Sequence, residues 1–398
     1  MKRLLIATFF ILPLFPTQLF ACEQWVQIAS FPAAARHRAT AFVVGNKGYV
    51  GGGHINSLFE VIHEDFWEYD PGSNTWTQIA NFPGGKRYHS VAFTIGDYGY
   101  VGCGEGENND YFNDFYRYVP GLNIWQPIAN FPGTPRRAAT SFVINNKGYV
   151  GTGQSDFGYE NNFYRYVPGT DSWEVVANFL GEARSSAVGF SHNGKGYVGT
   201  GHIFGDDTKD FYEYDPDLNQ WTQKADVGAI YRQDATGFVL NGFGYIATGN
   251  DVEGDNDYKD VWRYDFNTDT WTQIEDFCGA PRRYMVSFVL GNVAYAGGGT
   301  DGTNLNDFYM FNPLLSVDET EAVTIKIFPN PSSDLIELNF SKDHNDIKVY
   351  SLSGKLMFSG SDISDKVVFN KKDFGAGTFI YQITQNDESV HIGKFSFI

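Results

Sequence analysis

Six positions at corresponding points of a repeated pattern hold the side chains best suited to chemistry. They are Arg38, His89, Ala138, Ser186, Asp234 and Tyr284. An imidazole, a carboxylate, a phenol and a guanidinium together offer hydrogen-bond donors, acceptors and groups that exchange protons. Such a mixed polar set is a poor choice for plain packing, so it is our first candidate for a ligand-binding site. The alternative is that these side chains contact only water.

A second set lies two residues earlier in each unit and does not vary. It consists of Arg36, Arg87, Arg136, Arg184, Arg232 and Arg282. Six guanidinium groups near one mouth of a central channel could attract an anionic ligand. The planar guanidinium group binds a carboxylate through two parallel hydrogen bonds. A residue that recurs in every unit of a repeat is most simply structural, however. We therefore favour arginines that tie the units through carbonyl groups or an aspartate, and keep ligand binding as the alternative.

The elements that position both sets are short strands. In one unit Phe131–Gly153 reads FPGTPRRAATSFVINNKGYVGTG, and NFYRYVP and DSWEVVANF follow it. Val, Phe, Tyr and Trp favour strands, whereas Gly, Pro, Asn and Asp interrupt them. The pattern predicts four antiparallel strands in a unit of about 48 residues, a period typical of stacked or radial repeats.

The unit occurs six times, with one strand displaced. The second strand repeats a tyrosine, at Tyr49, Tyr100, Tyr149, Tyr197, Tyr245 and Tyr295, and the fourth repeats a tryptophan, at Trp76, Trp125, Trp173, Trp221 and Trp271. No tryptophan follows the sixth unit, but Trp25 stands before the first. Pairing the first segment with the last unit would close a ring and hide the strand edges that an open array exposes.

The tyrosine, the Gly-Gly or Gly-Thr-Gly doublet after it and the fourth-strand tryptophan together resemble the kelch repeat. The resemblance covers about residues 23–313, with small departures such as Ala247 and Cys103 within the glycine doublets. It implies an all-β, six-bladed β-propeller. In kelch modules that bind ligands, the start of the first strand is a usual contact region, which includes the six mixed positions. The fold alone does not define a function.

The loops between second and third strands differ from unit to unit and fall on the same face as the strand-one starts. Variable loops on a rigid scaffold are common binding elements. One of them carries Asp251, Glu253, Asp255 and Asp257 on alternate residues. Hard oxygen ligands at this spacing could hold calcium, but the loop lacks a full EF-hand pattern, and solvated acidic loops are common. We expect no metal or other cofactor.

Charge and cysteine content limit the function classes. The net charge of −18 argues against a nucleic-acid partner, which requires a basic face. Three cysteines are too few for a disulfide framework. Cys22 precedes a fourth strand of the predicted ring and Cys278 follows one, which places them on opposite faces, so we expect no bridge between them.

Residues 1–21 have the features of a secretory signal peptide. Lys2 and Arg3 precede an apolar run, and Leu19–Ala21 forms a cleavage site. The alternative, a membrane anchor, is disfavoured because Pro13 and Pro16 interrupt the run. The residues before Cys22 loosely match a lipoprotein signal, although Phe20 is unusual there. No later apolar run is long enough to cross a bilayer, so the mature chain should have no transmembrane helix.

A linker at 314–322 separates the ring from a predicted β-sandwich at 323–398. Pro329-Asn330-Pro331, then Tyr350–Lys355 and then Gly377 before a strand resemble the C-terminal sorting domain of type IX secretion in Bacteroidota. The resemblance implies the type IX machinery as a partner, export to the outer cell surface or medium, and removal of the tail. The alternative is a plain accessory sandwich.

Signatures of catalysis are sparse. Tyr88-His89 is similar to part of the galactose-oxidase copper site, but no second Tyr-His pair appears, and copper needs a larger ligand set. No nucleophile triad, zinc spacing or phosphate loop is present. We therefore favour a secreted or surface module that binds a glycan or protein. The alternative is a sugar-acid mutarotase of the kelch type, which acts on sialic acid and could use Arg38, His89, Asp234 and Arg232.

Overall fold

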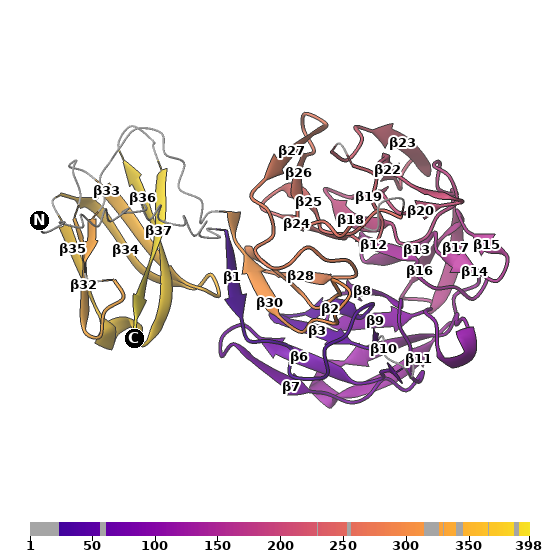
Figure 1. The fold of residues 1–398 in the computed structure, drawn as a ribbon, viewed down its shortest axis with the longest axis horizontal. Helices are drawn as coiled ribbons and strands as arrows, with labels where there is room; N and C mark the ends of the chain where they lie inside the picture. Colours follow the sequence, from indigo (N-terminus) through magenta and orange to yellow (C-terminus); the bar gives the residue numbers. More distant parts are fainter. Residues whose placement is uncertain are drawn as a thin grey trace, which may run out of the picture.

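The computed structural model describes residues 24–55, 61–228, 230–252, 256–313, 326–328, 330–339, 345–364, 366–385 and 390–398. The predicted signal peptide, Cys22 and the linker lie outside these ranges. Figure 1 shows a ring of small sheets and, beside it, a second group of strands formed by the C-terminal part of the chain.

One blade illustrates the unit. Strands β12 (Thr140–Ile144), β13 (Lys147–Gly151), β16 (Phe163–Val167) and β17 (Ser172–Val176) form an antiparallel sheet in that order. The turn between β12 and β13 has Asn145 at φ 49° and Asn146 at φ 57°. Two consecutive left-handed residues make the type I′ turn that suits a tight hairpin, and asparagine tolerates that conformation. The sequence Asn-Asn therefore fixes where the innermost hairpin turns.

Within the described residues, six four-stranded sheets make up the propeller, as predicted. The other five consist of β2 (Thr40–Val44), β3 (Lys47–Gly51), β6 (Phe66–Asp70) and β7 (Thr75–Gln78); β8 (Val91–Ile95), β9 (Tyr98–Gly102), β10 (Phe115–Val119) and β11 (Ile124–Ile128); β18 (Val188–His192), β19 (Lys195–Gly199), β22 (Phe211–Asp215) and β23 (Gln220–Lys224); β24 (Thr236–Leu240), β25 (Phe243–Ala247), β26 (Val261–Asp265) and β27 (Thr270–Ile274); and β28 (Val286–Leu290), β29 (Val293–Gly297), β30 (Phe308–Phe311) and β1 (Trp25–Ile28). Short pairs in the loops are β4 (His54–Ile55) with β5 (Val61–Ile62), β14 (Gln154–Ser155) with β15 (Gly158–Tyr159), and β20 (His202–Ile203) with β21 (Asp206–Asp207). Two 3₁₀ turns, Glu107–Asn109 and Pro120–Leu122, lie in the second blade.

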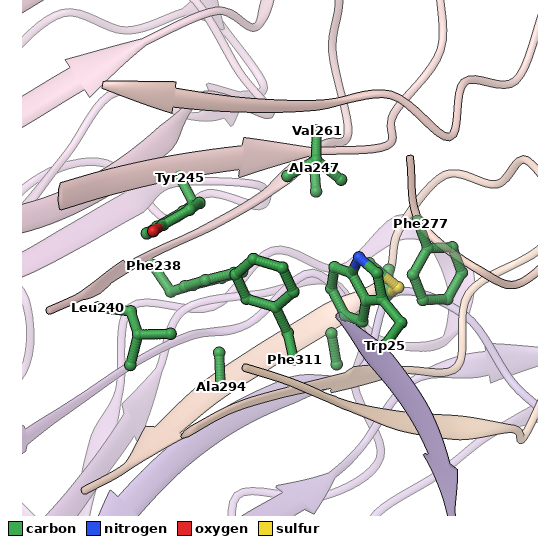
Figure 2. Packing of buried hydrophobic residues seen from close by; sticks show 11 residues of the cluster. Trp25, Phe238, Leu240, Tyr245, Ala247, Val261, Phe277, Ala294 and Phe311 are labelled. Atoms are coloured by element: carbon green, nitrogen blue, oxygen red, sulfur yellow. The ribbon is translucent and has the colours of Figure 1, made fainter. Parts of the chain in front are cut away.

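The displaced strand closes the ring. β1 pairs antiparallel with β30, with Trp25 opposite Phe311, which confirms the prediction from the missing tryptophan. The Trp25 side chain is 2% exposed and lies between Phe311 and Phe277, with ring centroids 4.7 and 4.9 Å away (Figure 2). The last blade therefore combines strands from the two ends of the propeller sequence.

The expectation that Cys278 forms no bridge is wrong. Cys278 is disulfide-bonded, and Cys103 is a free, buried thiol. The physical reason is strand twist, which brings the start of each outer strand against the residues that follow the outer strand of the preceding blade. At the ring closure the Gln24 N–H donates to Glu275 Oε2 at 2.8 Å, which places the start of β1 beside the end of β27 and not on the opposite face.

The C-terminal strands form two sheets around one core. The order is β31 (Lys326–Phe328), β32 (Leu335–Asn339) and β35 (Lys366–Asn370) in one sheet. The other has β34 (Leu356–Ile363), β33 (Asn345–Ser351), β36 (Gly377–Gln385) and β37 (Val390–Phe397), and helix α1 (Lys371–Phe374) follows β35. Buried Ile336, Val349 and Phe395 belong to the shared core, as expected of a sandwich. Among the described residues, no helix has the length and apolar character needed to span a bilayer.

Candidate functional site

The six mixed positions of the sequence line a single cavity of about 160 Å³. Each lies just before the first, innermost strand of its blade, so the ring brings them together at its centre. The residues that follow them also line the cavity and are mostly small: Ala39, Ser90, Ala139, Ala187, Ala235 and Met285. Small neighbours leave the central space open, and the varied side chains define its chemistry.

Backbone hydrogen bonds between successive blades position these side chains. All six residues have φ between 50° and 60° (Arg38, His89, Ala138, Ser186, Asp234 and Tyr284). From the second blade to the sixth, the N–H of each donates to the carbonyl of its counterpart in the preceding blade, at 2.9–3.4 Å. A left-handed conformation costs a non-glycine residue roughly 1–3 kcal/mol, but here all six blades share it. The strained backbone is therefore a property of the fold, and the chemistry lies in the side chains.

Four of the side chains form a connected network. Arg38 Nη2 donates to the Tyr284 hydroxyl at 2.8 Å, and the guanidinium carbon lies 4.4 Å from the centre of the Tyr284 ring. Asp234 accepts hydrogen bonds from Ser186 and Tyr284. The Asp234 side chain is 7% exposed, and this burial raises its pKa to about 6 despite the hydrogen bonds and the nearby Arg38 charge. Near neutral pH the cavity thus holds one cation linked to one carboxylate.

Two members of the set, Arg38 at Nε and His89 at both ring nitrogens, have buried polar atoms without a hydrogen-bond partner in the described part of the chain. The His89 ring lies 5.3 Å from that of Tyr284 and 5.7 Å from that of Tyr88. Both ring nitrogens are buried and have no hydrogen-bond partner in the described part of the chain. Burial first, and then the Arg38 charge, lower the pKa of His89 well below its usual value. The imidazole is therefore neutral, with one N–H donor and one bare acceptor nitrogen, and both nitrogens have almost no accessible surface in this conformation.

The recurring arginines do not line this cavity. They are 0–3% exposed, and Nη1 of each donates to the backbone carbonyl sixteen residues later in its own blade. Five also pair with an aspartate of the same blade (Asp65, Asp114, Asp210, Asp260 and Asp307), whereas Arg136 uses Asn162. These contacts fit the structural interpretation, except that the side chains brace single blades and do not tie one blade to the next. The link to the next blade is a backbone bond, such as Gly153 N–H to the Arg184 carbonyl at 2.7 Å.

A wider ring of polar residues, which we did not predict from the sequence, lies next to the cavity. The residue after each recurring arginine forms a β-bridge with the residue after each glycine doublet: His37–His54, Tyr88–Glu105, Arg137–Gln154, Ser185–His202, Gln233–Asn250 and Arg283–Thr300. Charged pairs link blades here, since buried Glu105 binds Arg137, and Asp257 accepts from Arg283 Nη1 at 3.0 Å. These positions also vary between units, one residue before the set that we singled out, so the same signal could have identified them.

The loops on this face carry exposed apolar tips and carboxylates. Phe157 in the β14–β15 turn is 87% exposed, and Phe204 in the β20–β21 turn is 95% exposed. Of the proposed calcium ligands, Asp251 accepts from the Tyr258 hydroxyl and Asp257 binds Arg283. Glu253 and Asp255 lie outside the described residues. The described carboxylates of this loop are thus engaged with protein groups.

Comparisons with known proteins agree with this architecture. Residues 35–83 match the kelch motif, and residues 326–396 match a secretion system C-terminal sorting domain. Kelch-like protein 35 of Homo sapiens is 31% identical over 80 residues, which are 20% of this chain and 13% of that protein. Kelch-like protein terF of Aspergillus terreus is 31% identical over 80 residues, covering 18% of this chain and 16% of its own length. The matches therefore span only a small part of these relatives.

A solved structure shares the fold of the ring. The "Structure of YjhT" superposes with a TM-score of 0.62 at 18% identity, covering 72% of this chain and 97% of that one. At this identity the likeness shows the fold alone.

Proposed function

We propose that this kelch-repeat propeller, which a type IX sorting domain directs to the cell surface or the extracellular space, is a binding or adhesion module. It engages a glycan or a protein through the face that carries the central cavity and the variable loops. The signal peptide at residues 1–21 and the tail from about Val323 are removed on the way. The partner is thus a molecule that the mature propeller meets outside the cell.

The observation that carries this proposal is the convergence of unlike residues. Six equivalent positions of a repeat hold six different side chains, and all of them meet in one cavity. A ring that needed only packing there would repeat one residue, as it does with the arginines two positions earlier. His89 and Arg38 add a second support, because buried nitrogens of both have no hydrogen-bond partner among the described residues. A ligand that pairs them removes the cost of leaving buried polar atoms unsatisfied.

A binding test with a matched histidine control addresses the proposal. The purified, exported protein is applied to arrays of glycans and of extracellular proteins. His89→Ala should reduce binding at least tenfold. His192→Ala is the control, because His192 is the last residue of the first strand of its blade, whereas the cavity lies at the start of that strand. If His89→Ala binds as wild type does, or if the wild-type protein binds nothing on either array, the proposal is wrong.

A further inference from the structure

We propose that one side of the cavity face binds a basic protein segment that carries large apolar side chains. This inference rests on the proposed binding function and names the class of partner that the loops of three neighbouring blades take. The surface is formed by exposed apolar residues of the third, fourth and fifth blades, which we call the apolar arc. Its members are Phe157, Leu180, Phe204, Tyr231 and Val252.

The members of the apolar arc are large side chains that the fold leaves in solvent. Phe157 and Phe204 are 87% and 95% exposed, and the other three are 50–62% exposed. Phe157, Phe204 and Val252 lie between the second and third strands of their blades. Leu180 and Tyr231 lie between a fourth strand and the first strand of the next blade, which puts them on the same face. Single exposed apolar residues are ordinary, but a group of them on one face indicates an interaction site.

The loops that carry the apolar arc contact one another from blade to blade. The Tyr159 ring, in the β14–β15 pair that bears Phe157, lies 5.5 Å from the His202 ring of the β20–β21 pair, measured between centroids. The Val252 N–H donates to Asp207 Oδ2 at 2.7 Å, which joins the loop of the fifth blade to β21. The three loops between second and third strands are therefore continuous.

The two remaining members lie beside the same loops. The Phe179 N–H, next to Leu180, donates to the Asn161 carbonyl at 2.7 Å, close to the end of the β14–β15 pair. The ammonium group of Lys209 lies 5.2 Å from the centre of the Tyr231 ring, which places Tyr231 against the loop that follows β21. All five apolar side chains thus belong to one connected group of loops.

Exposed carboxylates accompany the apolar arc. Four lie within five residues of an arc member in the sequence, and none forms an ion pair with another described residue. They are Asp156, Glu182, Asp206 and Asp226. The charge of Lys209 offsets one of these carboxylates, so the excess charge on this side of the face is negative.

This combination of side chains indicates the class of partner. Exposed carboxylates attract lysine and arginine and increase the rate of association, while apolar side chains supply contact area. Phenylalanine, leucine and valine side chains offer no hydrogen bonds to the hydroxyls of a glycan. An anionic membrane, into which exposed aromatic tips could insert, is repelled by the carboxylates. A basic protein segment with apolar side chains complements both the apolar and the acidic groups.

The opposite face of the fourth blade supplies a matched control. Asp217 and Leu218 are exposed neighbours in the turn between β22 and β23, where Leu218 is 65% exposed. This turn lies at the other end of the strands from the apolar arc. The pair therefore has the chemistry of one arc position without the neighbouring apolar loops.

The test selects a random library of peptides about 12 residues long, displayed on phage, against the purified, exported protein. Enriched peptides should carry a net positive charge and at least two large apolar residues. Fluorescence anisotropy at pH 7.5 then measures their affinity. The double variant Phe157→Ser/Phe204→Ser should bind about tenfold more weakly or worse. Asp217→Asn/Leu218→Ser should bind as wild type does, and the melts of both variants should match that of the wild-type protein.

A second variant tests the charges. Glu182→Gln/Asp206→Asn should weaken binding by about threefold or more and make the affinity less sensitive to salt, because screened attraction contributes less. If the opposite-face variant loses as much affinity as the double phenylalanine variant, the apolar arc is not the site.

The failure of this inference is distinct from the failure of the proposed function. Neutral or acidic enriched peptides, no enrichment, or equal binding by the wild-type protein and the phenylalanine variant would overturn the inference. So would binding to phosphatidylglycerol vesicles or to glycans alone. Each of these results leaves the proposed function to be decided by the array experiment with His89→Ala. If the arrays also show no ligand, the proposed function fails as well.

Discussion

The recurring arginines and the varied residues two positions after them begin the same six strands, yet their surroundings differ completely. Arg184 is fully buried, and its guanidinium is bound to Asp210, Thr208 and a carbonyl of its own blade. His89, at the varied position of another blade, has two buried nitrogens with no partner in the described chain. In a repeat, selection for folding acts on every unit alike, whereas a ligand needs a given side chain only once. We infer from the difference that the repeated arginines, bonded within each blade, hold the ring, and that the varied residues around the central cavity are the ones available to a ligand.

The largest effect is expected from a repeated core residue. Trp173→Ala should lower the free energy of unfolding by about 3–5 kcal/mol, because a large aromatic is lost from a packed site. Its ring lies 5.1 Å from Phe115 and 5.4 Å from Phe131, and Nε1 donates to the Ala129 carbonyl at 2.8 Å. Urea unfolding followed by tryptophan fluorescence measures this. A loss below about 1 kcal/mol would break the link between repetition and stability.

A slightly smaller loss is expected from a recurring arginine. Arg184→Ala should cost about 3 kcal/mol, because it leaves Asp210 and a buried carbonyl without their partner. Ligand binding by the folded fraction should be unchanged. Thermal melts and the array assay test both parts. If the melting temperature is unchanged and binding is abolished, the recurring arginines form the binding site. The roles of the recurring and the varied residues would then be exchanged.

Asp234, which stands at the varied position of one blade, should affect protein stability in a way that depends on pH. Burial raises the pKa of Asp234 to about 6, above its ordinary value of 3.8. Between these values the folded protein binds more protons than the unfolded chain, so stability falls as pH rises through this window. Asp234→Asn should remove that fall and be more stable than wild type at pH 7.5 by on the order of 1 kcal/mol, with the gain lost near pH 3.5. If the free energy of unfolding depends on pH in the same way in the wild-type protein and the variant, this prediction is wrong.

The smallest stability change is expected at His89. His89→Ala removes no hydrogen bond of the described chain and should shift the unfolding free energy by no more than about 0.5 kcal/mol, while ligand binding falls. Differential scanning calorimetry beside the binding assay resolves the two effects. If the melt drops as far as that of Arg184→Ala, His89 belongs with the repeated, structural residues.

Features carried by repetition were predictable from the sequence. Periodic tyrosines and tryptophans defined the blades, the displaced Trp25 predicted ring closure, and the break in symmetry selected residues that share a cavity. The Cys278 bridge was not predictable by counting strand ends, since it depends on blade twist. Nor was the contact of Arg38 with Tyr284 or the burial of Asp234. Both depend on side chains of different blades, and therefore on how closely the blades pack around the centre of the ring.

The pairing of β1 with β30 also bears on the order of biosynthesis. The strand that is synthesised first has its partner at the far end of the propeller sequence, so the ring stays open until translation has passed Phe311. Closing so long a loop adds little entropy cost, because that cost grows only with the logarithm of length. A chain that stops before β30 leaves β1 without its partner strand. The first strand thus makes a finished ring a property of the finished polypeptide, and a truncated product keeps an unpaired strand that can pair with another chain.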